Sequence, residues 1–301
     1  MFDFNAASRA RRCWKEHLVQ QAENAAPADV AALKQAARTA YPGIDAQLAR
    51  LHRDGVAVIE NYWDAGRCAQ ARAELDRLIL DQPGSVRLFS NGSDKRLFGA
   101  ERAGPQIRSF HEDSFLKSIG EIEGGFSIYN LVTLGARIDA TEANRGSGDG
   151  WHRDAFGYQF KAILYLSDVT DDNGPFEYMT GSHKLWRVGL DSALGRFPTP
   201  PETRIDRSHI DRQVERGLLS PRRFTARAGT VVLANTAGVH GGAPLKAGNR
   251  YALTNYYYYP YQIGKTLVEK FEPLVAGVSS RLALFLEAEE KAARATAGQQ
   301  T

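Results

Sequence analysis

Hydrophobic and polar positions follow a mostly helical pattern over the first 80 residues of the chain. Residues 31–40 are rich in alanine, and residues 64–80 place apolar or small side chains at helical spacing. Between these two segments, residues 55–62 form a short run rich in Val and Ile, which predicts a buried strand. The pattern therefore predicts a helical N-terminal layer that contains one strand.

From about residue 126 the spacing changes to short β-rich runs separated by turn residues. These runs span residues 126–138, 150–169, 176–182, 229–237 and 250–259. Such spacing is typical of an antiparallel sandwich or barrel. Residues 279–298 follow the pattern of a helix that frays into polar residues. Because no Pro/Gly/Ser-rich linker divides the chain, we expect a helical extension over 1–50, one main domain over 51–275, and a C-terminal helix and tail over 276–301.

Composition and charge narrow the class of protein. The chain has 301 residues and a formal net charge of +3, which implies no general attraction to nucleic acid or membranes. No apolar run approaches the roughly 20 residues that span a bilayer, and the basic N-terminus lacks the apolar segment of a secretory signal. Cys13 and Cys68 match no metal or redox spacing. We therefore expect reduced thiols in a cytoplasmic protein.

Three His-x-Asp triplets are the first candidates for chemistry: His111/Asp113, His152/Asp154 and His209/Asp211. The first precedes apolar residues at helical spacing, which favours a capping or surface role, and the third lies in a charged helical stretch typical of a solvated face. The middle triplet lies among aromatic and β-branched residues that favour extended structure. In a strand, residues i and i+2 face the same side. His152 and Asp154 then point into one cavity, as metal ligands or as a hydrogen-bonded core pair.

A third ligand and an anion-binding group occur further along the chain. His240 follows an apolar strand and has glycines at 238, 241 and 242, which let backbone, metal and a small ligand approach closely. Arg250 opens another strand, where it can clamp a carboxylate through two hydrogen bonds. A loop histidine and an exposed arginine are the alternatives. Two histidines and one carboxylate on one face match the facial triad of non-haem Fe(II) oxygenases. Zinc is the rival metal, but a zinc hydrolase needs no cosubstrate clamp.

Four sequence motifs carry a resemblance to a known family: LHRDGVAVIENYWDAGRCAQARAELDRL, WHRD, LSDVTDDNGPFEYMTGSHK, and VHGG followed by NRYALTNYY. From about Leu51 to Tyr259 the chain resembles the phytanoyl-CoA dioxygenase family of Fe(II)/2-oxoglutarate oxygenases. The resemblance implies a mainly β fold with flanking helices, a double-stranded β-helix (jelly-roll, cupin-like) core under a helical N-terminal layer. It also implies that residues 51–275 form the dioxygenase domain, that His152, Asp154 and His240 bind iron, and that Arg250 holds the C5 carboxylate of 2-oxoglutarate.

The chain departs from the family pattern at two positions. Thr180 replaces the usual Pro before GSHK, which we expect to alter a turn, and Gly242 stands where some members have a Ser that contacts the cosubstrate. His183 of GSHK is not a ligand in this interpretation, and the block is expected to shape a loop at the pocket. Arg137 and Asp139 align loosely with polar pocket residues of related hydroxylases, which makes them candidate cosubstrate-binding residues. A salt-bridged surface pair is the alternative.

The resemblance implies a hydroxylase that uses 2-oxoglutarate and O₂ on an unactivated C–H bond of a small metabolite, with anionic metabolites among the candidates. Alternatives are a hydroxylase of the lipopolysaccharide sugar Kdo, a cupin-like zinc or manganese hydrolase or isomerase, and a non-catalytic ligand-binding barrel. The segment Arg196–Arg227 contains eight arginines and four acidic residues. It is either a loop that steers an anionic substrate or an exposed charged helix. We expect a small-molecule substrate and no nucleic-acid or membrane partner, and the oligomeric state stays open.

Overall fold

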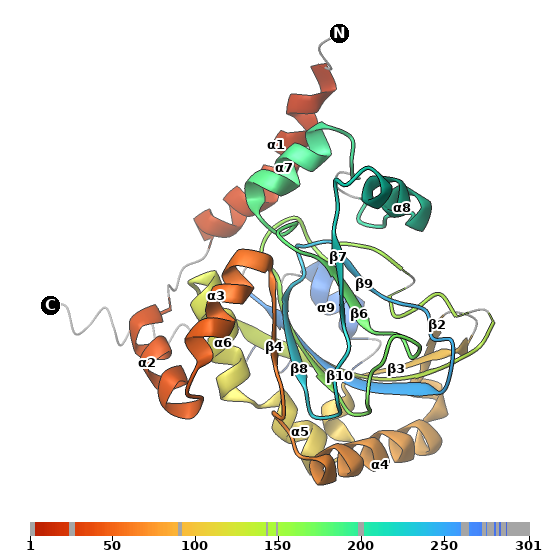
Figure 1. Cartoon of the computed structure of the whole chain (residues 1–301). Helices are drawn as coiled ribbons and strands as arrows, with labels where there is room; N and C mark the ends of the chain where they lie inside the picture. The colour runs from red at the N-terminus through yellow and green to blue at the C-terminus, as the bar shows by residue number, and fades with distance from the viewer. Residues whose placement is uncertain are drawn as a thin grey trace, which may run out of the picture.

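The computed structural model describes residues 4–23, 28–89, 92–142, 144–148, 150–197, 202–259 and 265–272, and the single residues 275, 280, 283 and 287. Its strands form two antiparallel sheets (Figure 1). The strand order of the larger sheet is β1 (Val56–Ile59), β8 (Val231–Asn235), β5 (Phe160–Tyr165), β10 (Asn249–Tyr258), β4 (Tyr129–Asp139), β3 (Asp94–Phe98) and β2 (Arg87–Phe89). The smaller sheet has the order β7 (Pro221–Phe224), β6 (Phe176–Met179) and β9 (His240–Gly242).

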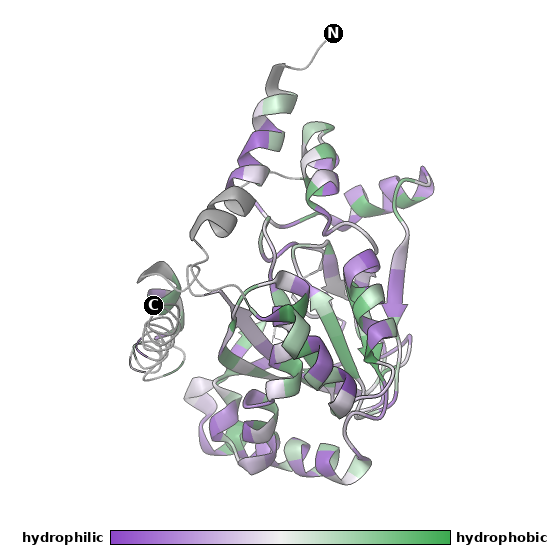
Figure 2. Cartoon of the chain, turned by 90° about the vertical axis from the view of Figure 1, so that its left-hand side faces the viewer, coloured by the Kyte–Doolittle hydropathy of each residue, from purple (hydrophilic) through white to green (hydrophobic). Residues whose placement is uncertain are grey.

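Helices surround these sheets. The α-helices are α1 (Phe4–Glu23), α2 (Val30–Ala40), α3 (Ile44–Asp54), α4 (Ala65–Asp81), α5 (Pro105–His111), α6 (Ser114–Gly124), α7 (Leu185–Ala193), α8 (Arg207–Glu215) and α9 (Lys265–Phe271). The 3₁₀-helices in the described part of the chain are η1 (Pro83–Ser85) and η3 (Ala100–Arg102). Many helices carry both polar and apolar residues around their circumference, as Figure 2 shows, because one side packs inward and the other meets water.

The two faces of the larger sheet have different neighbours. Helices α3 to α6 cover one face (Figure 1), where Val231 and Leu233 of β8 join the main hydrophobic core. The intervening Val232 and Ala234 pack on the other side, in a second core cluster that includes Tyr178 of the smaller sheet. Because side chains alternate along a strand, each central strand supplies both layers. The face of the larger sheet that carries Val232 and Ala234 therefore faces the smaller sheet, and Phe271 of α9 packs on the same face beside Val132 and Tyr258.

Isolated bridges extend the smaller sheet beyond β9. His152 pairs with His240 on one side and with Arg204 on the other. His240 in turn pairs with Tyr178 of β6. Directly paired residues project to the same side of a sheet. This row therefore places His152 and His240 on one face, next to Arg204.

Most predicted elements are present. The segments predicted as helices or a strand in the N-terminal part correspond to α2, α4 and β1. The predicted β-run over 150–169 is wrong in its first half, because β5 begins only at Phe160. Residues before it have irregular backbone, with positive φ at Gly148 and Gly150, since the chain crosses there from the smaller to the larger sheet. The predicted helix over 279–298 lies almost entirely outside the described residues, and the domain boundaries at residues 50 and 275 stay predictions.

The N-terminal helix α1 lies against α7, and the pair projects from the sheets (Figure 1). The Trp14 indole donates to Leu185 O, and the thiol of Cys13 lies 3.2 Å from the hydroxyl of Ser192. Cys13 and Cys68 are both buried and are not bonded to each other. Within the described ranges, no helix has both the length and the apolar character needed to cross a bilayer.

Candidate active site

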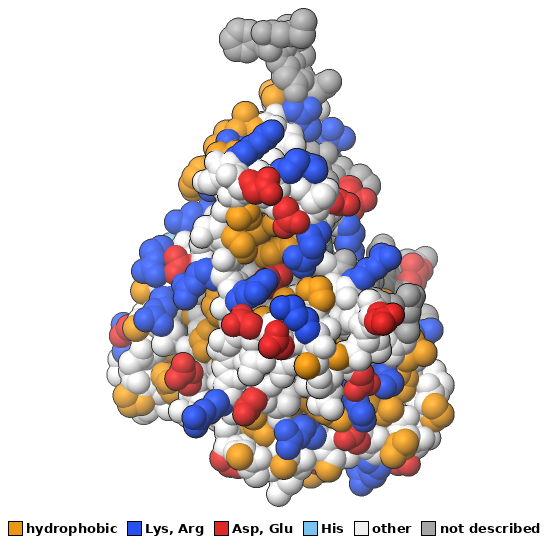
Figure 3. Space-filling view, turned by 45° about the vertical axis from the view of Figure 1, so that its right-hand side comes forward, with side chains coloured by type: hydrophobic (Ala, Val, Ile, Leu, Met, Phe, Trp, Pro, Cys, Tyr) orange, Lys and Arg blue, Asp and Glu red, His pale blue; other side chains and the backbone are white. Residues whose placement is uncertain are grey.

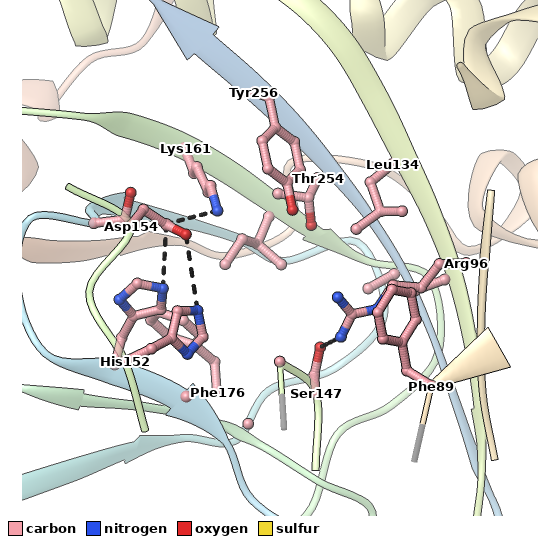
Figure 4. A pocket seen from close by; sticks show the side chains of 18 of the residues that line it. Phe89, Arg96, Leu134, Ser147, His152, Asp154, Lys161, Phe176, Thr254 and Tyr256 are labelled. Carbon is pink, nitrogen blue, oxygen red and sulfur yellow. Dashed lines mark hydrogen bonds and ion pairs between the residues drawn. The ribbon is translucent and has the colours of Figure 1, made fainter. Parts of the chain in front are cut away.

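A pocket of about 380 Å³ lies between the two sheets. At one end it holds His152, Asp154 and His240, the three residues predicted to bind a metal. Each offers one ligand atom, and these atoms all lie within 4.8 Å of one another. Figure 4 shows the Asp154 carboxylate between His152 and Lys161, with Tyr256 on the adjoining wall. The structure thus brings together residues that are 86 positions apart in the sequence, from 154 to 240.

The two histidines face each other across the antiparallel bridge. His152 N donates to His240 O at 2.8 Å, and His240 N donates to His152 O at 2.9 Å. The ring centroids are 4.3 Å apart. In each ring, Nδ1 lies 2.9 Å from the carbonyl oxygen two residues earlier, that of Gly150 or of Gly238. Nδ1 therefore donates to the backbone, which leaves Nε2 as the ligand atom.

The Asp154 carboxylate completes the group from the loop that follows His152. Its backbone N–H donates to Thr236 O at 3.0 Å, which ties the loop to the end of β8. Oδ1 lies 3.8 Å from Nε2 of His152, and Oδ2 lies 3.4 Å from Nε2 of His240. Oδ2 also forms an ion pair with Lys161 Nζ at 2.6 Å. This donor set is the two-histidine, one-carboxylate arrangement that holds non-haem Fe(II) and leaves positions open.

Burial and neighbouring charges set the protonation states of these groups. Burial, helped by His240, lowers the pKa of His152 to about 3, so its imidazole is neutral at pH 7. Burial alone would raise the pKa of Asp154, but Lys161 and His240 hold it well below its usual value. Burial would likewise lower the pKa of Lys161, but the Asp154 charge raises it. The site therefore presents a neutral imidazole and an ionised carboxylate, the forms in which both groups bind metals.

Arg250 lies in the same pocket at the start of β10, and it is only 5% exposed. Its Nη1 donates to Gly174 O, while its buried Nε has no hydrogen-bond partner among the described residues. Burial lowers the pKa of this guanidinium. A buried guanidinium with an unused N–H fits an anionic ligand. Ala252, Thr254 and Tyr256 line the pocket with Arg250, because alternate residues of a strand share one face.

Arg137 and Asp139 do not line the pocket, so the prediction that they bind the cosubstrate is wrong. The pocket-facing positions of β4 are Leu134 and Ala136. Because side chains alternate along the strand, Arg137 points to the opposite face. There it pairs with Asp76 at 3.2 Å and with Asp139 at 3.3 Å. The alternative, a salt-bridged surface pair, fits these contacts.

Gly242 has no space for the serine that some family members carry. A Cβ at this position would lie 2.7 Å from both the backbone N and the Cβ of Ser147. Ser147 itself lines the pocket, and its hydroxyl lies 3.4 Å from Nη2 of Arg96. A hydroxyl group is therefore present at this edge of the pocket, but it comes from another segment of the chain.

The GSHK block forms a loop that supports the strand of His240. The Ser182 hydroxyl accepts a hydrogen bond from Val239 N at 2.8 Å. His183 Nε2 lies 3.2 Å from His52 O, and His183 is not part of the possible ligand group. The block thus connects α3 to the residue before the distal histidine, in agreement with a role in shaping a loop.

The other two His-x-Asp triplets have structural roles. Asp113 is the N-cap of α6, where its carboxylate accepts from Leu116 N, and it also accepts from the Tyr62 hydroxyl at 2.6 Å. His209 lies on α8, and its ring contacts the carbonyl oxygen of Arg196. Neither triplet joins the possible ligand group found among the described residues.

Sequence-based prediction misses several polar pocket residues, among them Lys161, Arg96 and Ser147. Lys161 has a signal in the sequence, because it is the one charged residue of the strand FKAILY. Arg96 and Ser147 have none, since neither lies in a recognisable motif. Arg96 stacks over the ring of Phe89 at 4.6 Å, which Figure 4 shows at the far side of the pocket from Asp154.

The segment Arg196–Arg227 reaches the pocket chiefly through Arg204. Arg207 and Arg223 instead pair with Glu177 at 3.6 and 2.9 Å. Basic and acidic side chains are intermixed on the face shown in Figure 3. Since several arginines of this segment have acidic partners, its net field is weaker than the arginine count suggests.

Known structures share this fold. The epimerase SnoN from nogalamycin biosynthesis, in complex with Fe³⁺, alpha ketoglutarate and nogalamycin RO, aligns with a TM-score of 0.57 and 18% identity over 71% of this chain and 82% of that chain. EctD from S. alaskensis with bound Fe gives a TM-score of 0.54 and 18% identity over 72% of this chain and 76% of that chain. The carbocyclase SnoK from nogalamycin biosynthesis gives a TM-score of 0.51 and 14% identity over 70% of this chain and 82% of that chain. At such identities the likeness establishes the jelly-roll, cupin-like fold.

Sequence comparison identifies the family. A search of curated proteins found no match. The family model described as Phytanoyl-CoA dioxygenase (PhyH) matches residues 51–250, which include all three potential metal ligands and Arg250. Fe and 2-oxoglutarate are bound in structural neighbours, and the pocket of this chain contains a His–Asp–His group able to hold a metal. The chain therefore belongs to the phytanoyl-CoA dioxygenase (PhyH) family of Fe(II)/2-oxoglutarate-dependent enzymes.

Proposed function

We propose that this protein is an Fe(II)- and 2-oxoglutarate-dependent dioxygenase that hydroxylates an unactivated C–H bond of a small anionic metabolite. The observation that carries the proposal is the group formed by His152, Asp154 and His240 in a pocket that also contains buried Arg250. Metal and cosubstrate sites are thus adjacent on facing sheets. Their donors match the metal and the dicarboxylate that the reaction needs.

The residues present fit both groups. His152 and His240 would hold Fe(II) through Nε2, because each Nδ1 donates to a backbone carbonyl. Arg250 would pair with the distal carboxylate of 2-oxoglutarate through its unused N–H. Fe(II) with 2-oxoglutarate supplies the activation of O₂, with oxidation of the cosubstrate to succinate and CO₂ coupled to substrate hydroxylation.

The protein's own contribution is position and exclusion of water. Phe98, Leu134, Phe176 and Tyr256 give the pocket apolar and aromatic walls. A cavity of about 380 Å³ is in the range typical of small-molecule sites. In such a water-poor pocket, charge pairs are stronger than in solvent. The substrate would lie against these walls with one C–H bond toward the metal.

The charge of the pocket supports an anionic substrate. Its lining contains five basic side chains against the single carboxylate of Asp154: Arg96, Arg153, Lys161, Arg204 and Arg250. Arg204 is directly paired with His152 and is exposed, so it is the basic residue placed to meet an incoming anion. A sugar acid, a phosphate or a CoA ester belongs to this class of substrate.

Iron-dependent conversion of 2-oxoglutarate into succinate tests the reaction class. The wild-type protein should form succinate only with Fe(II) and O₂, and His152→Ala or His240→Ala should lose nearly all turnover and bound iron. His183→Ala is the matched control, because this histidine lies outside the ligand group and should keep its activity. Succinate formation by His240→Ala at the wild-type rate would refute the metal assignment.

Product analysis separates hydroxylation from other outcomes. SnoN is named an epimerase and SnoK a carbocyclase, so this fold also supports reactions that do not leave a hydroxyl group. A hydroxylated product gains one oxygen atom from O₂, whereas an epimer or a cyclised product does not. A hydrolase or a binding protein on the same fold would not consume 2-oxoglutarate at all.

A further inference from the structure

Lys161 is a buried lysine in direct contact with a potential metal ligand. Its side chain is 7% exposed, and its ammonium lies 2.6 Å from Oδ2 of Asp154. The same nitrogen lies 4.1 Å from the centre of the Tyr256 ring. Figure 4 shows it directed at the carboxylate from the wall of the larger sheet. Lys161 thus belongs to the metal end of the pocket, although it cannot itself be a metal ligand while protonated.

Packing alone gives no reason for a lysine at this position. Its neighbours on the pocket side of β5 are Ile163 and Tyr165. A methionine would fill the same space without the cost of burying an ammonium group. Because a buried ion pair repays little of its desolvation cost as stability, the charge of Lys161 points to a role at Asp154.

The two oxygens of Asp154 have different surroundings. Oδ2 is in contact with Lys161 and also lies 3.4 Å from Nε2 of His240, while Oδ1 has no such cation and lies 3.8 Å from Nε2 of His152. A carboxylate binds a metal through one oxygen or through both. If both oxygens bound, the carboxylate would fill one of the positions that the cosubstrate and O₂ need. An ammonium group that holds one oxygen leaves only the other for the metal.

We propose that Lys161 is a positioning residue that restricts Asp154 to a single metal-bound oxygen and so keeps three metal positions open. This inference rests on the proposed function, since it takes His152, Asp154 and His240 as the ligands. Without the cation, the second carboxylate oxygen is free to bind. The metal would then be held more tightly, with one fewer exchangeable position.

Mn(II) bound to the cosubstrate-free protein is the probe, and the number of its bound waters is counted by electron paramagnetic resonance in ¹⁷O-labelled water. A six-coordinate ion with three protein donors carries three waters. The wild-type protein and Lys161→Arg, which keeps the positive charge, should each show three waters bound to Mn(II). Lys161→Met should show two and should bind Mn(II) at least about fivefold more tightly, because it gains a ligand and loses a nearby positive charge.

Lys161→Gln serves as a second neutral variant if the methionine variant does not fold. Three waters in a folded neutral variant would overturn the inference, as would Mn(II) binding that is no tighter than in wild type. Failure of the wild-type protein to bind Mn(II) would instead contradict the metal centre of the proposed function. The inference about Lys161 would then be wrong as well. The two failures are therefore distinguishable.

Discussion

Replacement of Arg250 by Ala should sharply weaken 2-oxoglutarate binding. Arg250 is 5% exposed, and its Nε has no hydrogen-bond partner in the described part of the chain. Loss of one partner of a buried, hydrogen-bonded charge pair costs about 2–5 kcal/mol. At about 1.4 kcal/mol per tenfold change, this corresponds to a roughly 30- to several-thousand-fold loss of affinity.

The assay is an anaerobic titration of 2-oxoglutarate into Mn(II)-loaded protein by calorimetry. Arg250→Lys should fall between the wild type and the alanine variant, because lysine keeps the charge but loses the planar pair of donors. Arg137→Ala is the matched control. Its guanidinium lies on the adjoining strand but faces away from the pocket, toward Asp76. Its affinity for 2-oxoglutarate should therefore equal that of the wild type.

Two results would refute the reasoning. An unchanged affinity in a folded Arg250→Ala protein would mean that the distal carboxylate binds elsewhere. Equal losses in the Arg250 and Arg137 variants would point to general disruption of the sheet. Mn(II) affinity should stay near the wild-type value in all these variants, because Arg250 is not one of the potential ligands.

Three further predictions use other parts of the structure. Gly242→Ser should reduce 2-oxoglutarate affinity or stability, because the new side chain meets Ser147; improved binding by calorimetry would contradict this. In high chloride, mass spectrometry should show a product that gains oxygen and not chlorine, since the Asp154 carboxylate would occupy a metal position and disfavour a halide; a chlorinated main product would count against Asp154 as a ligand. Burial raises the pKa of Glu123 from 4.5 to about 7, so the folded protein favours the protonated carboxyl. Its contribution to the free energy of unfolding is fully present below pH 4.5 and is lost as the pH rises through 7. Glu123→Gln should therefore gain about 1–3 kcal/mol over the wild type in urea unfolding at pH 8 but little at pH 4.5, and an equal difference at both pH values would exclude this linkage.

Local sequence context was sufficient to select the three candidate metal ligands that the structure brings together. The aromatic surroundings of His152 and the glycines around His240 separate them from the other histidines. The two-residue period of strands also predicts which residues of β10 face the pocket with Arg250. These features depend on neighbours within a few positions, and such information is present in a single sequence.

Features that depend on long-range pairing could not be predicted. Residues Leu131 to Ala136 of β4 are buried on both faces, so the period-two pattern does not show which face carries the pocket, and it gives no sign that Arg137 faces away from it. Arg204 reaches the site only because it pairs with His152 across 52 positions of the sequence, from 152 to 204. The contact between Lys161 and Asp154 likewise depends on how the loop crosses between the sheets.

The most direct test of the account is a crystal structure of the protein grown anaerobically with Mn(II) and 2-oxoglutarate. The account predicts one metal ion bound by His152, Asp154 and His240, chelated by the cosubstrate, with the distal carboxylate on Arg250. Mn(II) bound to other residues, or 2-oxoglutarate bound away from the metal and Arg250, would contradict it.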